Sequence, residues 1–89
     1  MYLHLGQNVM VRGQDVIGIF DLDNTTWSFR TRRFLDKAER EGRVITVGDD
    51  LPRSFVLTQE GEGLPAVYIT QLSPATLQKR GSGGAWNEL

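Results

Sequence analysis

The sequence predicts a small α+β domain, built mostly of antiparallel strands with one central helix and a short C-terminal helix. The chain has 89 residues, which is the length of a single domain. Short apolar segments are separated by clusters of Gly, Asn and Asp, a pattern typical of strands joined by turns. Apolar residues at helical spacing occur between these segments. We expect the domain to cover residues 1–80 and residues 81–89 to form a flexible tail.

The N-terminal part of the chain is predicted to form three strands. Residues 2–5 alternate and lead into a turn at residues 6–8, after which residues 9–11 resume the extended pattern. A second turn follows at residues 12–15. The continuous apolar run of residues 16–20 predicts a strand that is buried on both faces.

The central helix is predicted to begin at Ser28 or Thr31 and to end at Glu41. Its apolar stripe is formed by Phe34, Leu35 and Ala38. Gly42 stands where a glycine commonly ends a helix in the left-handed conformation.

The C-terminal half predicts three more strands and the last helix. Residues 43–47 form one strand, and residues 54–58 and 66–70 have the pattern of the two arms of a hairpin. Ser73 followed by Pro74 is a usual helix start, because the hydroxyl caps the helix and proline suits its first position. We expect this helix to end at the glycine-rich segment after residue 80.

The composition excludes several classes of protein. Ten basic and 11 acidic residues give a net charge of −1, so long-range attraction to nucleic acid or membranes is weak. The apolar runs are far shorter than the roughly 20 residues that span a bilayer, and the N-terminus lacks the features of a signal peptide. No cysteine is available for disulfides or thiolate metal ligands. We expect a cytoplasmic protein with no membrane partner.

The polar residues predict no catalytic site, metal site or cofactor. His4 is the one histidine and lies in an alternating strand, with no cysteine or second histidine to complete a metal site. The carboxylates that could form an acid–base pair lie in turn-rich segments, where aspartate is expected for backbone reasons. These carboxylates are Asp21, Asp23, Asp49 and Asp50. Enzyme activity is therefore not expected.

A basic stripe on the central helix is the main candidate for a binding surface. Spacings of 3, 4 and 3 residues place four cations on one helix face, and these are Arg30, Arg33, Lys37 and Arg40. The stripe could contact phosphates of DNA, or it could be a solvated face whose cations pair with Asp36 and Glu41. Lys79 and Arg80 also suit the C-terminal end of a helix, where the dipole favours cations. The full set of candidate DNA-binding residues is Arg30, Arg33, Lys37, Arg40, Arg53, Lys79 and Arg80.

Association with further copies of the chain is expected, because a domain of this size buries a modest core. The candidate interface residues are apolar side chains near strand ends and turns, namely Tyr2, Trp27, Tyr68 and Leu72. Trp27 could instead pack at the start of the central helix, and Trp86 could dock on a neighbouring subunit or be incidental. We expect a homo-oligomer, with a closed ring as one form of it.

Three stretches of the chain together resemble a known family. They are Met1-Tyr2-Leu3-His4-Leu5-Gly6, then Asp15-Val16-Ile17-Gly18-Ile19-Phe20-Asp21-Leu22, and then the segments Leu51-Pro52-Arg53-Ser54-Phe55-Val56-Leu57-Thr58, Val67-Tyr68-Ile69 and Leu72-Ser73-Pro74-Ala75-Thr76-Leu77-Gln78-Lys79-Arg80. In their order and spacing, residues 1–80 are similar to the RemA/RemB family of bacterial extracellular matrix regulatory proteins. The resemblance implies a cytoplasmic regulator of biofilm matrix genes. It also implies DNA binding, assembly into rings and a subunit similar to the LytTR type of DNA-binding domain.

One departure from the family pattern concerns the DNA-binding edge. The resemblance implies a basic pair just before residues 54–58, but the matching positions here are Asp49, Asp50, Leu51 and Pro52. Only Arg53 is basic, and the aspartates would repel phosphate. Two functions stay open. One is an oligomeric DNA-binding transcriptional regulator that contacts phosphates through repeated basic side chains. The other is a protein–protein interaction module that regulates matrix expression without binding DNA, which the pI of about 5.7 favours.

Overall fold

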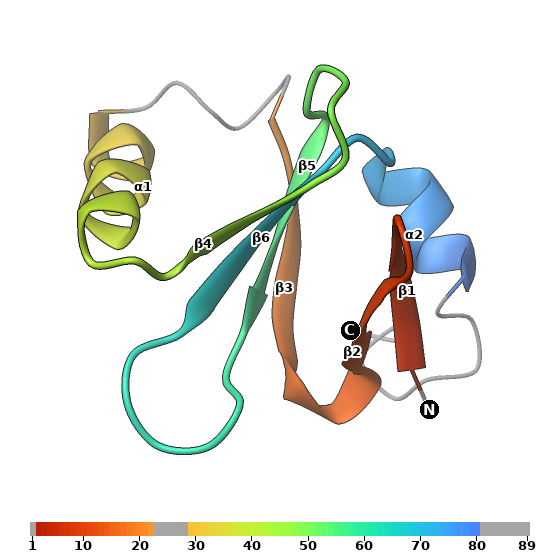
Figure 1. The fold of residues 1–89 in the computed structure, drawn as a ribbon, viewed down its shortest axis with the longest axis horizontal. Helices are drawn as coiled ribbons and strands as arrows, with labels where there is room; N and C mark the ends of the chain where they lie inside the picture. The colour runs from red at the N-terminus through yellow and green to blue at the C-terminus, as the bar shows by residue number, and fades with distance from the viewer. Residues whose placement is uncertain (1, 23–28, 81–89) are drawn as a thin grey trace.

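The computed structural model describes residues 2–22 and 29–80 and arranges them in two sheets and two helices (Figure 1). The predicted α+β class is therefore confirmed. In chain order the elements are β1 Tyr2–Gly6, β2 Val9–Arg12, a 3₁₀ turn Gly13–Asp15, β3 Val16–Asp21, α1 Phe29–Arg40, β4 Val44–Val47, β5 Ser54–Thr58, β6 Ala66–Thr70 and α2 Pro74–Arg80. Neither of these helices is long and apolar enough to cross a bilayer. Trp27, Trp86 and the predicted tail at 81–89 lie outside the described residues.

The larger sheet contains four strands in the order β3-β5-β6-β4. β5 pairs antiparallel with both β3 and β6, which confirms the predicted hairpin of β5 and β6. β4 pairs with β6 in parallel, a pairing that was not predicted from the sequence. Because β3 runs in the same direction as β4, α1 serves as the crossover between the two edge strands of the sheet.

The smaller sheet is the hairpin of β1 and β2, in which Leu3 lies opposite Val11 and His4 opposite Met10. Its turn residues Gln7 and Asn8 have φ angles of 49° and 64°. Positive φ at both central residues is the signature of a type I′ turn, whose twist matches that of the flanking strands.

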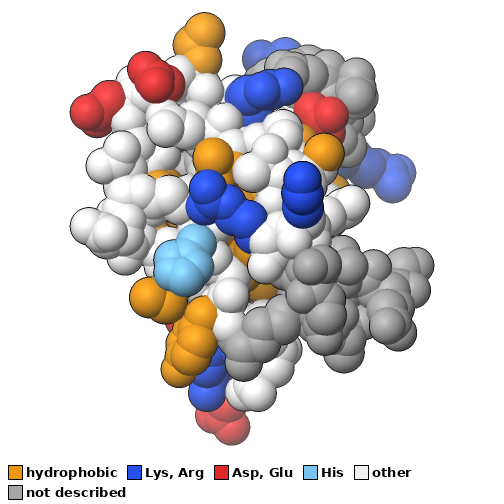
Figure 2. All heavy atoms as spheres, turned by 90° about the vertical axis from the view of Figure 1, so that its right-hand side faces the viewer, with side chains coloured by type: hydrophobic (Ala, Val, Ile, Leu, Met, Phe, Trp, Pro, Cys, Tyr) orange, Lys and Arg blue, Asp and Glu red, His pale blue; other side chains and the backbone are white. Residues whose placement is uncertain are grey.

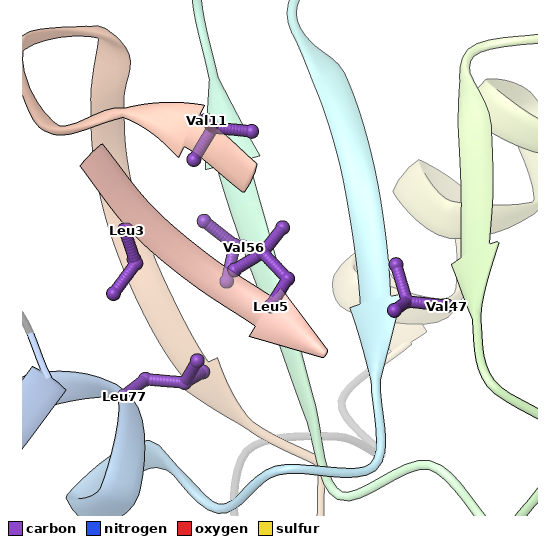
Figure 3. Close-up of a cluster of buried hydrophobic side chains, with 6 residues drawn as sticks. All are labelled: Leu3, Leu5, Val11, Val47, Val56 and Leu77. Atoms are coloured by element: carbon purple, nitrogen blue, oxygen red, sulfur yellow. The ribbon is translucent and has the colours of Figure 1, made fainter. Parts of the chain in front are cut away.

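The larger sheet is covered on both of its faces (Figure 1). On one face, the hairpin and α2 enclose a buried cluster of Leu3, Leu5, Val11, Val47, Val56 and Leu77 (Figure 3). On the other face, α1 packs over a second cluster of Leu22, Ala38, Phe55 and Val67. Neighbouring residues of a strand point to opposite faces, which is why Phe55 and Val56 belong to different clusters.

Two buried hydroxyl groups attach the hairpin and the α2 connection to the sheet. Thr70 Oγ1 donates to the Leu5 carbonyl at 2.7 Å and accepts the Leu72 backbone N–H at 3.2 Å. Ser54 Oγ donates to the Leu72 carbonyl at 2.7 Å. Since buried polar groups are costly when unpaired, these bonds fix how the two layers meet.

Both helices have the ends that the sequence predicts. Gly42 follows α1 with a φ of 72°, and the Arg43 N–H donates to the Ala38 carbonyl at 2.9 Å. This bond is the long-range part of a Schellman motif. α2 begins after Ser73, whose Oγ accepts the Thr76 backbone N–H at 3.2 Å, the bond expected of an N-cap.

β3 is not buried on both faces, so that prediction is wrong. Ile17 is 52% exposed. β3 is an edge strand, and its register with β5 shifts between Val16 and Gly18. A shift of this kind leaves one residue out of the regular alternation, which is how an apolar side chain in the middle of the run reaches the surface.

Candidate functional site

The predicted basic stripe lies on the outer side of α1. All four of its members are exposed: Arg30, Arg33, Lys37 and Arg40. Between them, Ala38 is buried and Phe34 and Leu35 are half-buried against the sheet. The helix therefore holds its apolar side on the sheet and presents its cations to solvent.

The first turn of α1 carries cations where the backbone favours anions. Arg30 and Arg32 are exposed there, and the turn holds no acidic residue. Because the amide groups at a helix N-terminus carry partial positive charge, each such cation costs a few tenths of a kcal/mol, up to about 1 kcal/mol. Lys37 and Arg40 lie in the last turn, where the same dipole favours them. The first-turn arginines are thus not explained by helix stability.

The other predicted basic residues lie away from α1. Lys79 and Arg80 are exposed at the end of α2, on the opposite side of the larger sheet (Figure 1). Arg53 is exposed in the segment that leads into β5. Figure 2 shows the side of the molecule with the hairpin and α2, where Lys and Arg side chains are exposed. The structure therefore does not bring the predicted basic residues together on one surface of a single subunit.

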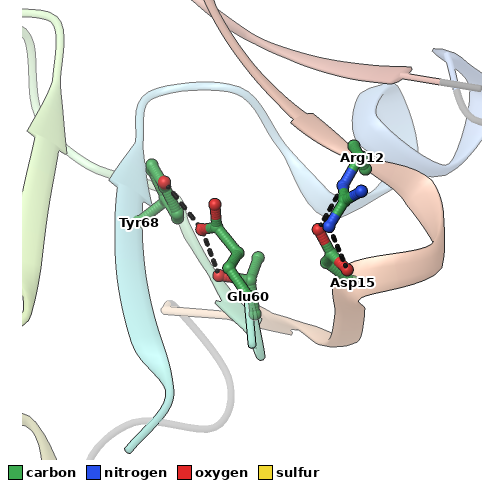
Figure 4. A network of polar contacts seen from close by, with 5 residues as sticks. Arg12, Asp15, Glu60 and Tyr68 are labelled. Carbon is green, nitrogen blue, oxygen red and sulfur yellow. Dashed lines mark hydrogen bonds and ion pairs between the residues drawn. The ribbon is translucent and has the colours of Figure 1, made fainter. Parts of the chain in front are cut away.

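Two further arginines are engaged within the fold. Arg43 donates to the Glu41 carboxylate at 2.9 and 2.7 Å and to the Pro65 carbonyl at 2.6 Å. Arg12 makes a two-point contact with Asp15, at 2.8 and 3.4 Å (Figure 4). These interactions hold the two side chains against residues near loops and strand ends of the fold.

Two of the predicted interface residues are built into the subunit itself. Tyr68 is half-buried against the cluster beneath the hairpin, and its hydroxyl donates to the Glu60 carboxylate at 3.0 Å (Figure 4). Burial first, then this hydrogen bond and the Glu60 charge, raise the pKa of Tyr68. Leu72 is half-buried against the same cluster. Trp27 lies outside the described residues.

Tyr2 lies on the outer face of the hairpin, beside a residue that the sequence analysis did not single out. Tyr2 is 58% exposed and Met10 is 50% exposed, with His4 exposed opposite Met10. Figure 2 shows histidine and hydrophobic side chains next to one another on this side of the molecule. The alternation of β2 could have identified Met10, because it places Met10 opposite in direction to the buried Val11.

An open apolar pocket lies between α1 and the β3–β5 half of the larger sheet. Its volume is about 290 Å³, and it is lined by Phe20, Arg30, Thr31, Phe34, Phe55 and Leu57. The Phe20 and Phe55 rings stack with their centroids 4.8 Å apart. α1 packs mainly on β4 and β6, so the β3–β5 half of this face is less covered. The sequence alone does not predict the pocket, because its lining comes from three separate elements.

The loop between β4 and β5 carries the aspartates that stand in place of the expected basic pair. Asp49 and Asp50 are exposed, and Leu51 is 86% exposed, more than any other large hydrophobic side chain of the described residues. Within residues 2–22 and 29–80, no group of three or more histidines or carboxylates could hold a metal ion. Asp23 lies outside the described residues. The loop thus exposes an apolar side chain next to two carboxylates.

Comparison with known proteins gives two matches. Residues 2–80 match the model of the RemA-like family, described as extracellular matrix regulatory protein A-like. The chain is also 34% identical over 80 residues to extracellular matrix regulatory protein B of Bacillus subtilis (strain 168). That alignment covers 90% of this chain and 89% of the relative. The family match extends from β1 to the end of α2.

Proposed function

This chain belongs to the RemA-like family of extracellular matrix regulatory proteins, and we propose that it is a homo-oligomeric, DNA-binding transcriptional regulator of matrix genes. Membership of this family supports a role as a regulator of matrix genes. DNA contact, assembly into an oligomer and a LytTR-like subunit are the parts that the proposal adds.

The exposed cations of α1 are the observation that supports DNA binding. Arg30, Arg33, Lys37 and Arg40 share the solvent side of one helix. The first-turn arginines are unfavourable for the helix itself, which is expected of side chains kept for an anionic ligand. Repeated cations of this kind contact phosphates and release counterions, so binding should weaken steeply as salt rises. Sequence preference would come mainly from DNA shape.

Assembly into an oligomer is the second part of the proposal. It is needed because the charge of one subunit favours DNA binding only weakly. The net charge of the chain is −1, and the cations of α1 and α2 lie on opposite sides of the larger sheet. An oligomer, for instance a ring, repeats the α1 surface along the DNA. Several weak phosphate contacts then act together, and avidity raises the overall affinity.

The experiment that tests DNA binding reverses two charges on each side of the sheet. Arg33→Glu with Lys37→Glu alters α1, and Lys79→Glu with Arg80→Glu is the matched change on α2. Gel shifts of a 30–40 base-pair duplex, a length of about three to four helical turns, are recorded at several salt concentrations. We expect the α1 variant to lose affinity and its log–log salt slope to fall by about 0.9 for each phosphate that the variant no longer neutralises. The α2 variant should change the shift less.

A second candidate function is supported by the acidic loop. Asp49 and Asp50 are exposed where the family resemblance leads one to expect cations, and carboxylates repel phosphate. The protein would then regulate matrix expression by binding another protein. Wild-type protein that fails to shift the duplex at low salt, while keeping its oligomeric mass in light scattering, would favour this second function over the first.

A further inference from the structure

We propose that the apolar pocket beside α1 receives Leu51 from a second copy of the chain, and that the contact is reciprocal between the two copies. This inference deepens the assembly part of the proposed function by naming one interface. It does not depend on DNA binding: in a docked pair the first-turn arginines face the aspartates of the other copy, and Lys37 and Arg40 remain exposed in the last turn of α1.

The pocket offers a surface suited to one branched apolar side chain. On the sheet side it is lined by Phe20, Phe55 and Leu57, and on the helix side by Thr31 and Phe34. The volume of about 290 Å³ is small for a drug-sized ligand, for which pockets of roughly 300–1,000 Å³ are usual. It is large enough for a leucine side chain and part of its backbone.

Leu51 has the properties of the side chain that would enter such a pocket. It is 86% exposed, although burial of a leucine is strongly favourable in water. Pro52 follows it, and a residue before proline is restricted to extended backbone. The leucine therefore stands on a loop with fewer conformations to lose when it docks.

The charges around the two surfaces are complementary. Asp49 and Asp50 precede Leu51 in the loop, and both are exposed. Arg30 lines the pocket and Arg32 is exposed in the same turn of α1, which holds no acidic residue. A docked Leu51 would bring the aspartates next to these arginines, so charge complementarity would fix the orientation of the loop.

The positions of the loop and the pocket in the fold allow a reciprocal contact. The loop leads directly into Ser54 at the start of β5, and Ser54 pairs with Asp21 at the end of β3. Phe20 and Phe55, which line the pocket, are the next pair along these strands. The loop therefore lies at the Phe20–Phe55 end of the pocket, and Leu57 extends the lining along β5. In a two-fold pair, each copy can present its loop to the other's pocket.

Leu64 is the alternative occupant within the chain, and it fits less well. It is 63% exposed in the loop between β5 and β6, two residues after Glu62. This loop lies at the other end of β5 from Phe20 and Phe55, beyond Leu57 of the pocket lining. It provides a control of similar sequence, because both loops contain the pair Leu-Pro, directly after Asp50 in one and separated from Glu62 by Gly63 in the other.

The absence of cysteine from the chain makes disulfide crosslinking a direct test. Copies carrying Leu51→Cys are mixed with tagged copies carrying Thr31→Cys, oxidised mildly and separated on a non-reducing gel. The control mixture combines Leu64→Cys with the same Thr31→Cys copies. Because docking raises the local concentration of the two thiols, we expect at least about tenfold more mixed dimer from the first mixture than from the second.

A charge exchange tests the complementarity independently. Asp50→Arg should lower the oligomeric mass measured by light scattering, and combining it with Arg30→Asp should restore that mass. Equal mixed dimer from both crosslinking mixtures, or an oligomeric mass unchanged by Asp50→Arg, would overturn the proposed contact. Gel shifts of the wild-type protein are scored separately, so loss of this interface and loss of DNA binding are distinguishable.

Discussion

The two faces of the larger sheet are covered in different ways. Under the hairpin and α2, Leu3, Leu5 and Leu77 are fully buried, and the Thr70 hydroxyl ties the layers together. Under α1, Ala38 is fully buried, but Phe34 and Leu35 are only half-buried and an open pocket remains beside β3 and β5.

This difference separates the stabilising part of the molecule from the part available for binding. The hairpin and α2 together cover the first face, so the side chains of its buried cluster are not accessible to a partner. One helix covers part of the second face, and that helix carries the exposed cations and one wall of the pocket. Regions with fewer buried contacts are also those from which binding surfaces are usually drawn. Paired substitutions, one on each face, therefore test this difference in packing and binding.

The largest contrast is expected from two leucines that occupy corresponding places on the two helices. Leu77→Ala on α2 empties a fully buried position and should lower the free energy of unfolding by about 3 kcal/mol. Leu35→Ala on α1 removes a half-buried side chain and should cost about half as much. Urea unfolding of the two variants measures both values. Equal losses would mean that the α1 face is as tightly packed as the other.

A smaller effect is expected from the hydroxyl that connects the hairpin to the sheet. Thr70→Val keeps the shape of the side chain but leaves the Leu5 carbonyl and the Leu72 N–H without this partner. Loss of a buried partner should lower the free energy of unfolding by about 1–3 kcal/mol. Thr46→Val is the control at an exposed position of β4, where a change within about 0.5 kcal/mol is expected. If both variants unfold alike in urea, the Thr70 bonds do not hold the layers together.

Local sequence signals predicted the elements of this fold well. Gly42 and the pair Ser73-Pro74 marked helix ends because capping depends on a few neighbouring residues. The parallel pairing of β4 with β6 was missed, since it depends on where α1 carries the chain across the sheet. The exposure of Ile17 was missed for a similar reason, because an edge position and a register shift are properties of pairing rather than of composition.

The candidate site was also predicted only in part. Features that depend on neighbouring residues were predicted, and features that depend on the folded chain were not. The basic stripe was found because its members lie on one helix, where spacing alone fixes the face. The separation of Lys79 and Arg80 from that stripe could not be read from the sequence, since the intervening sheet creates it. The pocket was also out of reach, because Phe20, Phe34 and Phe55 meet only in the folded chain.

An effect of alkaline pH is expected from the closed face. Burial and the bond to Glu60 raise the pKa of Tyr68 above that of an unfolded tyrosine, which is about 10. The folded state then holds this proton more tightly, so the contribution is complete below pH 10 and is lost as pH rises through the folded pKa. Tyr68→Phe should make the loss of stability above pH 10 shallower and cost about 0.5–1 kcal/mol at neutral pH.

Glu60→Gln is the matched variant for that profile. It removes the charge beside Tyr68 and keeps the burial, which is the larger cause of the shift. Its loss of stability above pH 10 should therefore lie between those of the wild type and Tyr68→Phe. Thermal unfolding from pH 8 to 11 measures the three curves, and curves that coincide would remove Tyr68 as the source of the effect.

The smallest expected effect tests the charges on α1. The helix dipole predicts that charge reversal changes the free energy of unfolding in opposite directions at the two ends of the helix. Arg30→Glu replaces a cation with an anion in the first turn and should raise the free energy of unfolding by about 0.3–1 kcal/mol. Arg40→Glu makes the same exchange in the last turn and should lower it by a similar amount. Urea unfolding at low salt measures both, and changes of the same sign would exclude the helix dipole as their cause.

A stabilising Arg30→Glu that also weakens crosslinking through Thr31→Cys or the DNA gel shift would show what the arginine is for. The fold alone would favour a carboxylate at this position, so a gain in stability with a loss in binding identifies Arg30 as a residue kept for its partner. A gain in stability with both kinds of binding intact would instead assign the function of this face to the cations farther along α1, Lys37 and Arg40.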